Sequence, residues 1–190
     1  MKKYILVVCA LFVATMTIAQ DLKNPSFEEV ISLHSVSNAL ISPNGQHIVF
    51  QVGTADWKNN RFDREMWISK NGNTPFQITN NLKNSSGNAK WSPNGEWIAF
   101  LSNRNEKNQI HAIRLAGGES FQITHTKGNI SNFEWSPDGK QIAFLQSEDK
   151  TKELKKRKDI YGGFAVEDEE YSLNQLWVTH FNPDQLNYMA

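Results

Sequence analysis

Three stretches of the chain repeat one pattern, a short polar turn followed by a run of apolar residues: Ile41–Phe50 (ISPNGQHIVF), Trp91–Phe100 (WSPNGEWIAF) and Trp135–Phe144 (WSPDGKQIAF). In each turn, proline presets φ at the first corner, asparagine or aspartate tolerates the second, and glycine accepts the φ that follows. The apolar residues after each turn stand at successive positions and do not alternate with polar ones. Such a run is typical of a strand that is covered on both faces.

Two further elements recur between these stretches, always in the same order. An apolar strand comes first and a Phe-Gln-Ile-Thr segment follows; the strands are Glu65–Ser69, Gln109–Leu115 and Gln175–Thr179, and the segments are Pro75–Asn81 and Ser120–Thr126. Asn71-Gly72-Asn73 and Gly117-Gly118 lie between them and supply residues that adopt positive φ in a hairpin. The prolines of the turns are spaced by 50 and 44 residues. Recurrence near this length, with several short strands per period, is typical of the blades of a β-propeller.

The fold class expected from this recurrence is all-β, a partial β-propeller of about three to three and a half four-stranded blades with WD-like SPDG repeats. Trp91 and Trp135 precede two of the turns. We interpret them as wedges that pack between adjacent blades, because buried aromatic side chains usually contribute packing area. The alternative is an aromatic binding platform.

Two segments stand outside the repeat. The first, Asn24–Val36, carries Ser26 and Glu29 at the spacing of a capping box and an apolar stripe behind them. It predicts a short N-terminal helix within a lead-in over residues 20–36, followed by the incomplete propeller over residues 37–190. The second is a charged insertion over residues 147–174, where the preceding blade has only the short loop Ser102–Asn108. Long insertions of this kind are often functional, although this one is also interpretable as a solvated, charge-balanced loop.

The N-terminus predicts export. Lys2 and Lys3 precede an apolar run from Tyr4 to Ile18 that ends beside Ala19. A basic start, a short apolar core and a small residue at the cleavage point are typical of a secretory signal peptide, here residues 1–19 with cleavage after Ala19. The alternative is an uncleaved anchor, but the run is shorter than the roughly 20 apolar residues that span a bilayer. We therefore expect a periplasmic or extracellular protein.

Composition excludes several classes of protein. The 190 residues include 20 Lys and Arg and 20 Asp and Glu, and removal of Lys2 and Lys3 leaves 18 basic residues. This balance argues against a nucleic-acid partner or a polybasic membrane protein. Hydrophobic residues make up 39% of the chain, which is enough for a packed core. The single cysteine excludes a disulfide scaffold.

No catalytic constellation is present in the sequence. The five histidines are scattered singly, and there is no G-x-S-x-G motif, no H-E-x-x-H motif and no glycine loop of the phosphate-binding type. We assign no catalytic residue, no metal ligand and no cofactor to these 190 residues.

The leading helix, the WSPDGKQIAF repeat and the insertion KKRKDIYGGFAVEDEEYSLNQLWV together resemble the N-terminal propeller of the prolyl oligopeptidase family of serine peptidases, in its dipeptidyl-peptidase and acylaminoacyl-peptidase branch. The resemblance covers roughly Asp21 to Thr179. The SPDG motif alone is shared with TolB-like periplasmic propellers. In the peptidases, a propeller of about seven blades precedes an α/β-hydrolase domain with a Ser-Asp-His triad. The resemblance therefore implies an N-terminal fragment, or a truncated product, that ends before the hydrolase domain.

In that family the propeller caps the hydrolase, restricts entry to short peptides and, in some members, anchors the free amine of the substrate with carboxylates. The dense acidic cluster Glu167, Asp168, Glu169 and Glu170 is the candidate for such an anchor. The alternative is that these carboxylates only offset the basic run before them.

Two functions follow from the resemblance. One is the substrate-gating portion of an exported serine peptidase that hydrolyses short peptides, with those peptides and the absent catalytic domain as partners. The other is a non-catalytic TolB-like periplasmic propeller that binds or scaffolds a protein partner. A third interpretation is that the chain is a degraded remnant without activity. A further copy of the chain is also a candidate partner, and no membrane span is expected.

Overall fold

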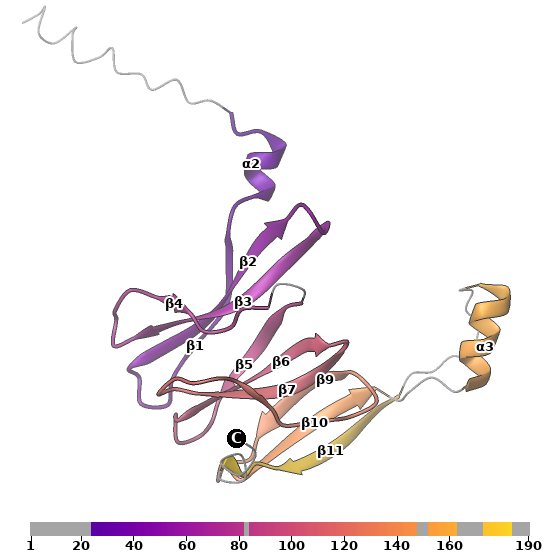
Figure 1. Cartoon of the computed structure of the whole chain (residues 1–190). Helices are drawn as coiled ribbons and strands as arrows, with labels where there is room; N and C mark the ends of the chain where they lie inside the picture. The colour runs from indigo at the N-terminus through magenta and orange to yellow at the C-terminus, as the bar shows by residue number, and fades with distance from the viewer. Residues whose placement is uncertain (1–23, 82–83, 148–151, 163–172, 184–190) are drawn as a thin grey trace, which may run out of the picture. The chain divides into compact units, whose positions relative to one another are not determined.

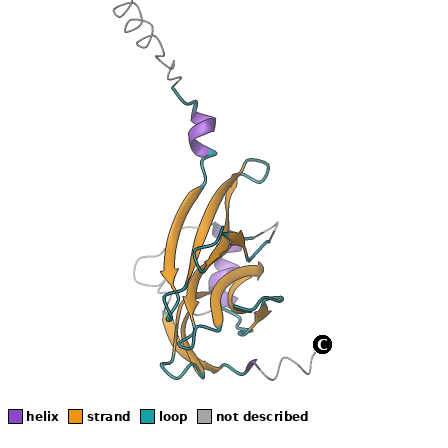
Figure 2. Ribbon diagram, turned by 90° about the vertical axis from the view of Figure 1, so that its left-hand side faces the viewer, coloured by secondary structure: helices purple, strands orange, loops and turns teal. Residues whose placement is uncertain are grey.

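A computed structural model describes residues 24–81, 84–147, 152–162 and 173–183 of the chain (Figures 1 and 2). The chain divides into two compact units, Met1–Leu33 and His34–Ala190, and each is described by itself. No helix in the described segments is both long enough and apolar enough to cross a membrane. The predicted signal peptide, residues 1–19, lies outside the described residues.

The described part of the first unit contains the short helix α2 (Phe27–Ile31). Its capping box is formed as predicted: the backbone N–H of Glu29 donates to Ser26 Oγ at 3.2 Å, and the backbone N–H of Ser26 donates to Glu29 Oε2 at 2.7 Å. The helix is shorter than the predicted segment Asn24–Val36, because Ser35 and Val36 already pair with the neighbouring strand of the first sheet.

The described residues of the second unit form three antiparallel sheets, which we call blades 1 to 3. Blade 1 comprises β1 (Ser35–Ile41), β2 (His47–Asp56), β3 (Arg61–Lys70) and β4 (Phe76–Gln77). Blade 2 comprises β5 (Ser86–Trp91), β6 (Trp97–Asn105), β7 (Lys107–Arg114) and β8 (Phe121–Gln122). Blade 3 comprises β9 (Ile130–Trp135), β10 (Gln141–Ser147) and β11 (Asn174–His180). The all-β partial propeller is therefore confirmed.

The repeated turn before the second strand of each blade has one structure in all three copies. In blade 2, Ser92 Oγ accepts a hydrogen bond from the backbone N–H of Trp97 at 3.0 Å and donates to Asn94 Oδ1 at 2.7 Å. Asn94 Oδ1 also accepts from the backbone N–H of Glu96 at 3.1 Å. Gly95 then takes a φ of 71°, in the region that glycine favours. The tight turn is confirmed, and the serine hydroxyl closes it.

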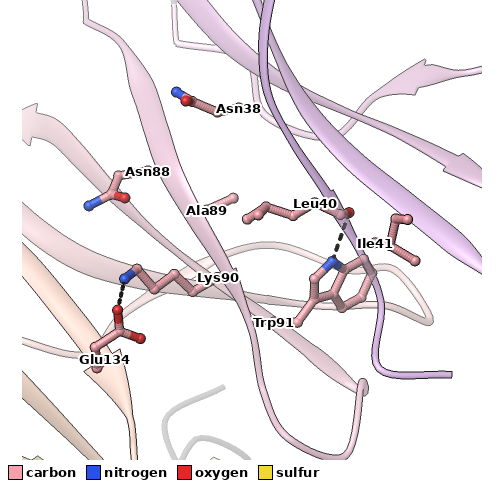
Figure 3. Close-up of a pocket in the computed structure, with 8 residues that line it drawn as sticks. All are labelled: Asn38, Leu40, Ile41, Asn88, Ala89, Lys90, Trp91 and Glu134. Carbon is pink, nitrogen blue, oxygen red and sulfur yellow. Dashed lines mark hydrogen bonds and ion pairs between the residues drawn. The ribbon is translucent and has the colours of Figure 1, made fainter. Parts of the chain in front are cut away.

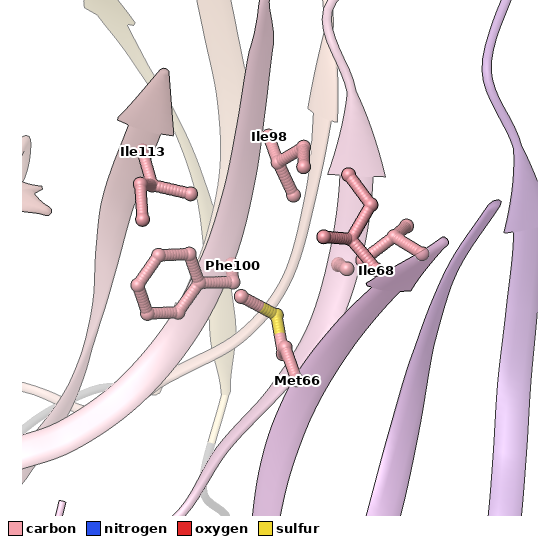
Figure 4. Packing of buried hydrophobic residues seen from close by; sticks show 7 residues of the cluster. Met66, Ile68, Ile98, Phe100 and Ile113 are labelled. Carbon is pink, nitrogen blue, oxygen red and sulfur yellow. The ribbon is translucent and has the colours of Figure 1, made fainter. Parts of the chain in front are cut away.

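The core lies between the blades, in two clusters. Blades 1 and 2 enclose the first, which includes Met66, Ile68, Ile98, Phe100 and Ile113 (Figure 4). Blades 2 and 3 enclose the second, which includes Ala99, Ile110, Ile130, Phe133, Ile142 and Phe144. β6 thus supplies successive residues to both clusters, which confirms the prediction of a strand covered on both faces.

The same prediction is wrong for β2 of blade 1. Val49 is fully buried, whereas the adjacent Ile48 is 40% exposed. The two side chains point to opposite faces of the sheet, since successive residues of a strand alternate. Within the described residues, only one face of β2 is covered by a neighbouring blade.

The two tryptophans that precede the turns join consecutive blades, as predicted. The indole N–H of Trp91 donates to the carbonyl oxygen of Leu40 in β1 at 3.2 Å. The indole N–H of Trp135 donates in the same way to the carbonyl oxygen of Lys90 in β5 at 3.3 Å. Both side chains also pack against a core cluster, so each wedge combines apolar contact with one hydrogen bond.

The insertion leaves and re-enters blade 3 at a single point of its sheet. Ser147 and Asn174 are register partners at the end of the β10–β11 pair. The equivalent connection in blade 2 is the single residue Glu106, with a φ of 71°. The insertion contains the helix α3 (Lys152–Tyr161), which takes up most of the basic run.

Candidate functional site

A pocket lies where the first strands of the blades approach one another (Figure 3). β1 contacts β5, and β5 contacts β9. The pocket has a volume of about 400 Å³ and is lined by Asn38, Leu40, Ile41, Asn88, Ala89, Lys90, Trp91 and Glu134. We call it the first-strand pocket.

One part of the first-strand pocket is apolar. Leu40 and Ile41 come from β1, and Ala89 and Trp91 come from β5. The hydrogen bond from the Trp91 indole to the Leu40 carbonyl ties the two strands together at this point. The apolar wall is therefore built across the junction of two blades, and the indole ring has a defined position in it.

The rest of the pocket is polar but carries no net charge. Lys90 and Glu134 form an ion pair, and the Lys90 ammonium also lies 5.7 Å from the centre of the Phe133 ring. Asn38 Nδ2 donates to Gln51 Oε1 at 2.9 Å. Asn88 Nδ2 donates to Asn132 Oδ1 at 3.4 Å. Amide groups and a neutralised pair of charges thus stand next to the apolar wall.

A second polar group, around Glu65 in β3, is buried between strands. Thr79 Oγ1 donates to the Glu65 carboxylate, and the backbone N–H of Asn81 donates to Glu65 Oε1 at 2.6 Å. Burial raises the pKa of Glu65, although both of these hydrogen bonds act in the opposite direction. Gln109 has the equivalent place in blade 2, where its Oε1 accepts from the backbone N–H of Thr126 at 2.9 Å. The recurrence identifies this group as part of the blade architecture.

His111 in β7 is a buried titratable residue, only 2% exposed. Its ring stacks on Phe100 with centroids 5.7 Å apart, and neither ring nitrogen has a hydrogen-bond partner among the described residues. Burial, followed by the charges of Arg104 and His125, lowers the pKa of His111 to about 4. The imidazole is therefore neutral near pH 7. No hydroxyl or carboxylate is hydrogen-bonded to it in the described part of the chain.

The acidic residues Glu167, Asp168, Glu169 and Glu170 lie outside the described residues, so their role as an amine anchor stays a prediction. Within the described ranges, no group of three or more histidine, cysteine, aspartate or glutamate residues could hold a metal ion. Of the residues that line the first-strand pocket, the sequence singled out only Trp91, as a wedge between blades or an aromatic binding platform; the others were not predicted. A signal for them exists, because Asn38, Asn88 and Asn132 each stand five residues before the proline of a turn.

Comparisons with known proteins agree with the fold. Dipeptidyl-peptidase 5 of Porphyromonas gingivalis is 34% identical over 84 residues, which are 44% of this chain and 12% of that protein. An acylaminoacyl peptidase of Pyrococcus horikoshii superimposes with a TM-score of 0.60 at 16% identity, over 80% of this chain and 24% of that chain. An acylaminoacyl peptidase in complex with Z-Gly-Gly-Phe-chloromethyl ketone gives a TM-score of 0.62 at 15% identity, again over 80% and 24%.

The chain thus spans between about an eighth and a quarter of the length of these relatives. The two structural similarities show the fold alone, and they confirm the resemblance to the propellers of acylaminoacyl peptidases at that level. The profile of the TolB beta propeller domain family matches residues 14–165, which is most of the sequence. With three blades of the expected construction in the structure, this match shows that the chain belongs to the TolB beta propeller domain family.

Proposed function

We propose that the chain is the substrate-gating propeller portion of an exported serine peptidase that hydrolyses short peptides. The observation that carries the proposal is its similarity to three peptidases: one by sequence, Dipeptidyl-peptidase 5, and two by fold over 80% of the chain. The 190 residues contain no G-x-S-x-G motif. The catalytic serine would therefore belong to a hydrolase domain encoded outside them, which would be the first partner of this propeller.

The test is made on the native gene product. Sequencing of the transcript past the codon for Ala190 is expected to show an open frame with a nucleophile elbow followed by aspartate and histidine. A fluorophosphonate probe, which reacts with activated serines, should then label the native protein, and replacement of the elbow serine by alanine should abolish labelling. A stop codon directly after Ala190, or a full-length product that the probe does not label, would overturn the proposal.

A non-catalytic TolB-like propeller that binds a protein partner is the second candidate, favoured by the family profile. The same experiment separates the two functions. Further SPDG repeats without a hydrolase domain, together with a protein partner that co-purifies from cross-linked cells, would establish the second function in place of the first.

Export is part of the proposal and has its own test. We expect a mature protein that begins at Gln20, because cleavage after Ala19 would follow the apolar run. N-terminal sequencing of the protein from the cell envelope or the medium checks this. A product that keeps Lys2 and Lys3 and stays in the cytoplasm would exclude export.

Within this function we propose that Glu167, Asp168, Glu169 and Glu170 bind the free amine of the substrate. In the complete enzyme, the double variant Glu169→Gln/Glu170→Gln should raise KM about tenfold for peptides with a free N-terminus and leave N-acetylated peptides unaffected. The exposed pair Glu96→Gln/Glu119→Gln is the control for loss of negative charge elsewhere. An unchanged KM in the first variant would exclude the anchor.

A further inference from the structure

The first-strand pocket contains an asparagine from each of two blades, Asn38 and Asn88, and Asn132 of blade 3 stands at the same position of the repeat. The backbone explains two of the three. Asn38 and Asn88 have φ values of 52° and 50°, which asparagine tolerates better than most residues. Asn132 lies in β9 without a positive φ, so its backbone does not call for asparagine. What the three positions share is the side-chain amide.

These amides keep hydrogen-bonding groups that the described protein does not use. Each asparagine has one acceptor oxygen and two donor hydrogens. Asn38 uses a donor on Gln51, and Asn88 uses a donor on the oxygen of Asn132. In the described part of the chain, the oxygen and one N–H of both Asn38 and Asn88 stay available in the pocket. Both acceptors and donors are therefore offered, which is what the main-chain amides of a peptide require.

The charges of the pocket oppose a ligand with a charged end. Lys90 and Glu134 neutralise one another, and Lys90 is further held over the Phe133 ring. A free carboxylate or ammonium would meet a charge that is already neutralised by its partner, so it would gain little from an ion pair of its own. An uncharged segment needs no ion pair, so the electrostatics favour the interior of a peptide over its ends.

The apolar wall completes the ligand chemistry. Leu40, Ala89 and Trp91 line the same pocket as Asn38 and Asn88, and its volume of about 400 Å³ is in the ordinary range of ligand pockets. Figure 3 shows Leu40 and Trp91 on one side of β5 and Asn88 on the other. We propose that the first-strand pocket binds an uncharged, extended peptide segment, with main-chain amides on the asparagines and one apolar side chain against Leu40 and Trp91. This binding is independent of the proposed peptidase function, because it requires only residues of this chain.

The test uses the full 190-residue chain and the blocked peptide N-acetyl-Ala-Leu-Ala-amide as the probe, with binding measured by calorimetry and by the indole N–H resonance of Trp91. That resonance is assigned by its loss in Trp91→Phe. We expect saturable binding that shifts the Trp91 signal. N-acetyl-Ala-Gly-Ala-amide should bind about tenfold more weakly, because it lacks the apolar side chain.

The asparagines are tested by Asn88→Gly, which removes the amide and keeps a residue suited to positive φ. It should weaken binding about five- to tenfold. Asn71→Gly is the matched control, since Asn71 has a φ of 53° and lies in the hairpin after β3, outside the pocket. Asn132→Ala is a second variant, placed on an exposed strand position, in case Asn88→Gly disturbs folding.

The inference would be overturned by no saturable binding of the blocked peptide, by equal affinities for Asn88→Gly and Asn71→Gly, or by a shift confined to tryptophans other than Trp91. Much tighter binding of unblocked Ala-Leu-Ala would also overturn it, since it would show recognition of a charged end. A negative fluorophosphonate experiment leaves all of these results unaffected, so failure of the peptidase proposal and failure of this one are distinguishable.

Discussion

Blade 2 and blade 3 carry the same strand sequence pattern in different surroundings. Met66, Ile110 and Leu176 stand at equivalent positions of the third strand in blades 1, 2 and 3. Met66 and Ile110 are 1% and 0% exposed, because a following blade covers each of them, whereas Leu176 is 71% exposed. The repeat therefore determines which residues are suited to an interface between blades. A neighbouring blade decides whether they are buried.

A second position of the third strand does not hold the same aromatic residue in all three blades. His111 of blade 2 has the place of Trp67 in blade 1 and Trp177 in blade 3, each opposite a phenylalanine of the second strand. The smaller ring stands in the blade that is covered on both faces. Its two unpartnered nitrogens make burial costly in the charged form, which the lowered pKa of His111 reflects.

The largest expected difference in the free energy of unfolding is between substitutions at the equivalent residues Ile110 and Leu176. Ile110→Ala should lower the free energy of unfolding by about 2–5 kcal/mol, because it leaves a cavity in a covered interface. Leu176→Ala should change it by less than about 0.5 kcal/mol, as is usual for exposed positions. Urea denaturation of the full chain measures both values. Equal losses would mean that the face of blade 3 is covered in solution, and would break the comparison.

The pH dependence of stability should differ between His111 and its apolar replacement. The pKa of His111 is about 4 in the folded chain and near 6.5 in the unfolded chain, so the unfolded state binds the proton first as pH falls. Stability from the neutral imidazole is complete above pH 6.5 and is lost between pH 6.5 and 4, by about 3 kcal/mol.

His111→Phe should remove this loss while keeping the stacking on Phe100. Denaturation at several pH values checks the difference between the two proteins. Identical pH profiles would show that the pKa of His111 is the same in the folded and the unfolded chain.

The equivalent residues Glu65 and Gln109 should not be interchangeable. Gln109 Nε2 donates to the carbonyl oxygens of Thr126 and Gly128, both at 3.3 Å. Gln109→Glu would put a carboxylate against these oxygens and should cost about 2–3 kcal/mol at pH 7. Both oxygens of Glu65 accept hydrogen bonds, so Glu65→Gln turns one acceptor into a donor that faces Thr79. Because the Thr79 hydroxyl can turn to accept, this exchange should cost only about 1 kcal/mol.

For Glu65, the sign of the pH effect is the reverse of that for His111. The pKa of Glu65 is higher in the folded chain than in the unfolded chain, where it is near 4.5. The protonated carboxyl therefore adds to stability at pH values below 4.5, and this contribution is lost as pH rises through the pKa of the folded chain. Glu65→Gln should remove this part of the pH profile. The comparison between blades would fail if both exchanges, Glu65→Gln and Gln109→Glu, cost the same.

The smallest effect is expected at the tryptophan wedge. Trp91→Phe keeps an aromatic ring between blades 1 and 2 but removes the hydrogen bond to the Leu40 carbonyl, at a cost of about 0.5–1.5 kcal/mol. Ile41 has the equivalent place in blade 1 and is largely exposed, so Ile41→Val should be within about 0.5 kcal/mol of the parent. Thermal denaturation of the Trp91→Phe and Ile41→Val variants measures both effects. A Trp91→Phe variant as stable as the parent would show that the wedge acts by packing alone.

Much of the fold could be predicted because its signals are local. The turn at Ser92–Gly95 depends on a hydroxyl, an amide and a glycine within a few residues, and the capping box of α2 depends on Ser26 and Glu29. The end of α2 could not be predicted in this way. It depends on pairing of Ser35 with Gly53, which is distant in sequence.

The candidate site was missed for a similar reason. Asn88, Lys90 and Glu134 have no motif that announces a pocket, and they become neighbours only because β5 lies between β1 and β9. The density of charge along the sequence points instead to the acidic cluster Glu167–Glu170, which lies outside the described residues. Repeat position, five residues before each proline, would have been the better guide to the asparagines.

The amino-acid sequence by itself determined the blade repeat and its turns, because both arise from interactions within one period of the chain. The tryptophan wedges could be predicted from their place in the repeat, although their hydrogen bonds reach the preceding blade. Only the tertiary structure decided that Ile110 is buried and Leu176 exposed, and that Asn38 and Asn88 line one neutral pocket. Whether a side chain is buried, and which side chains come together, depends on the neighbouring blade. The residues of that blade are distant in the sequence, so no local pattern indicates the contact.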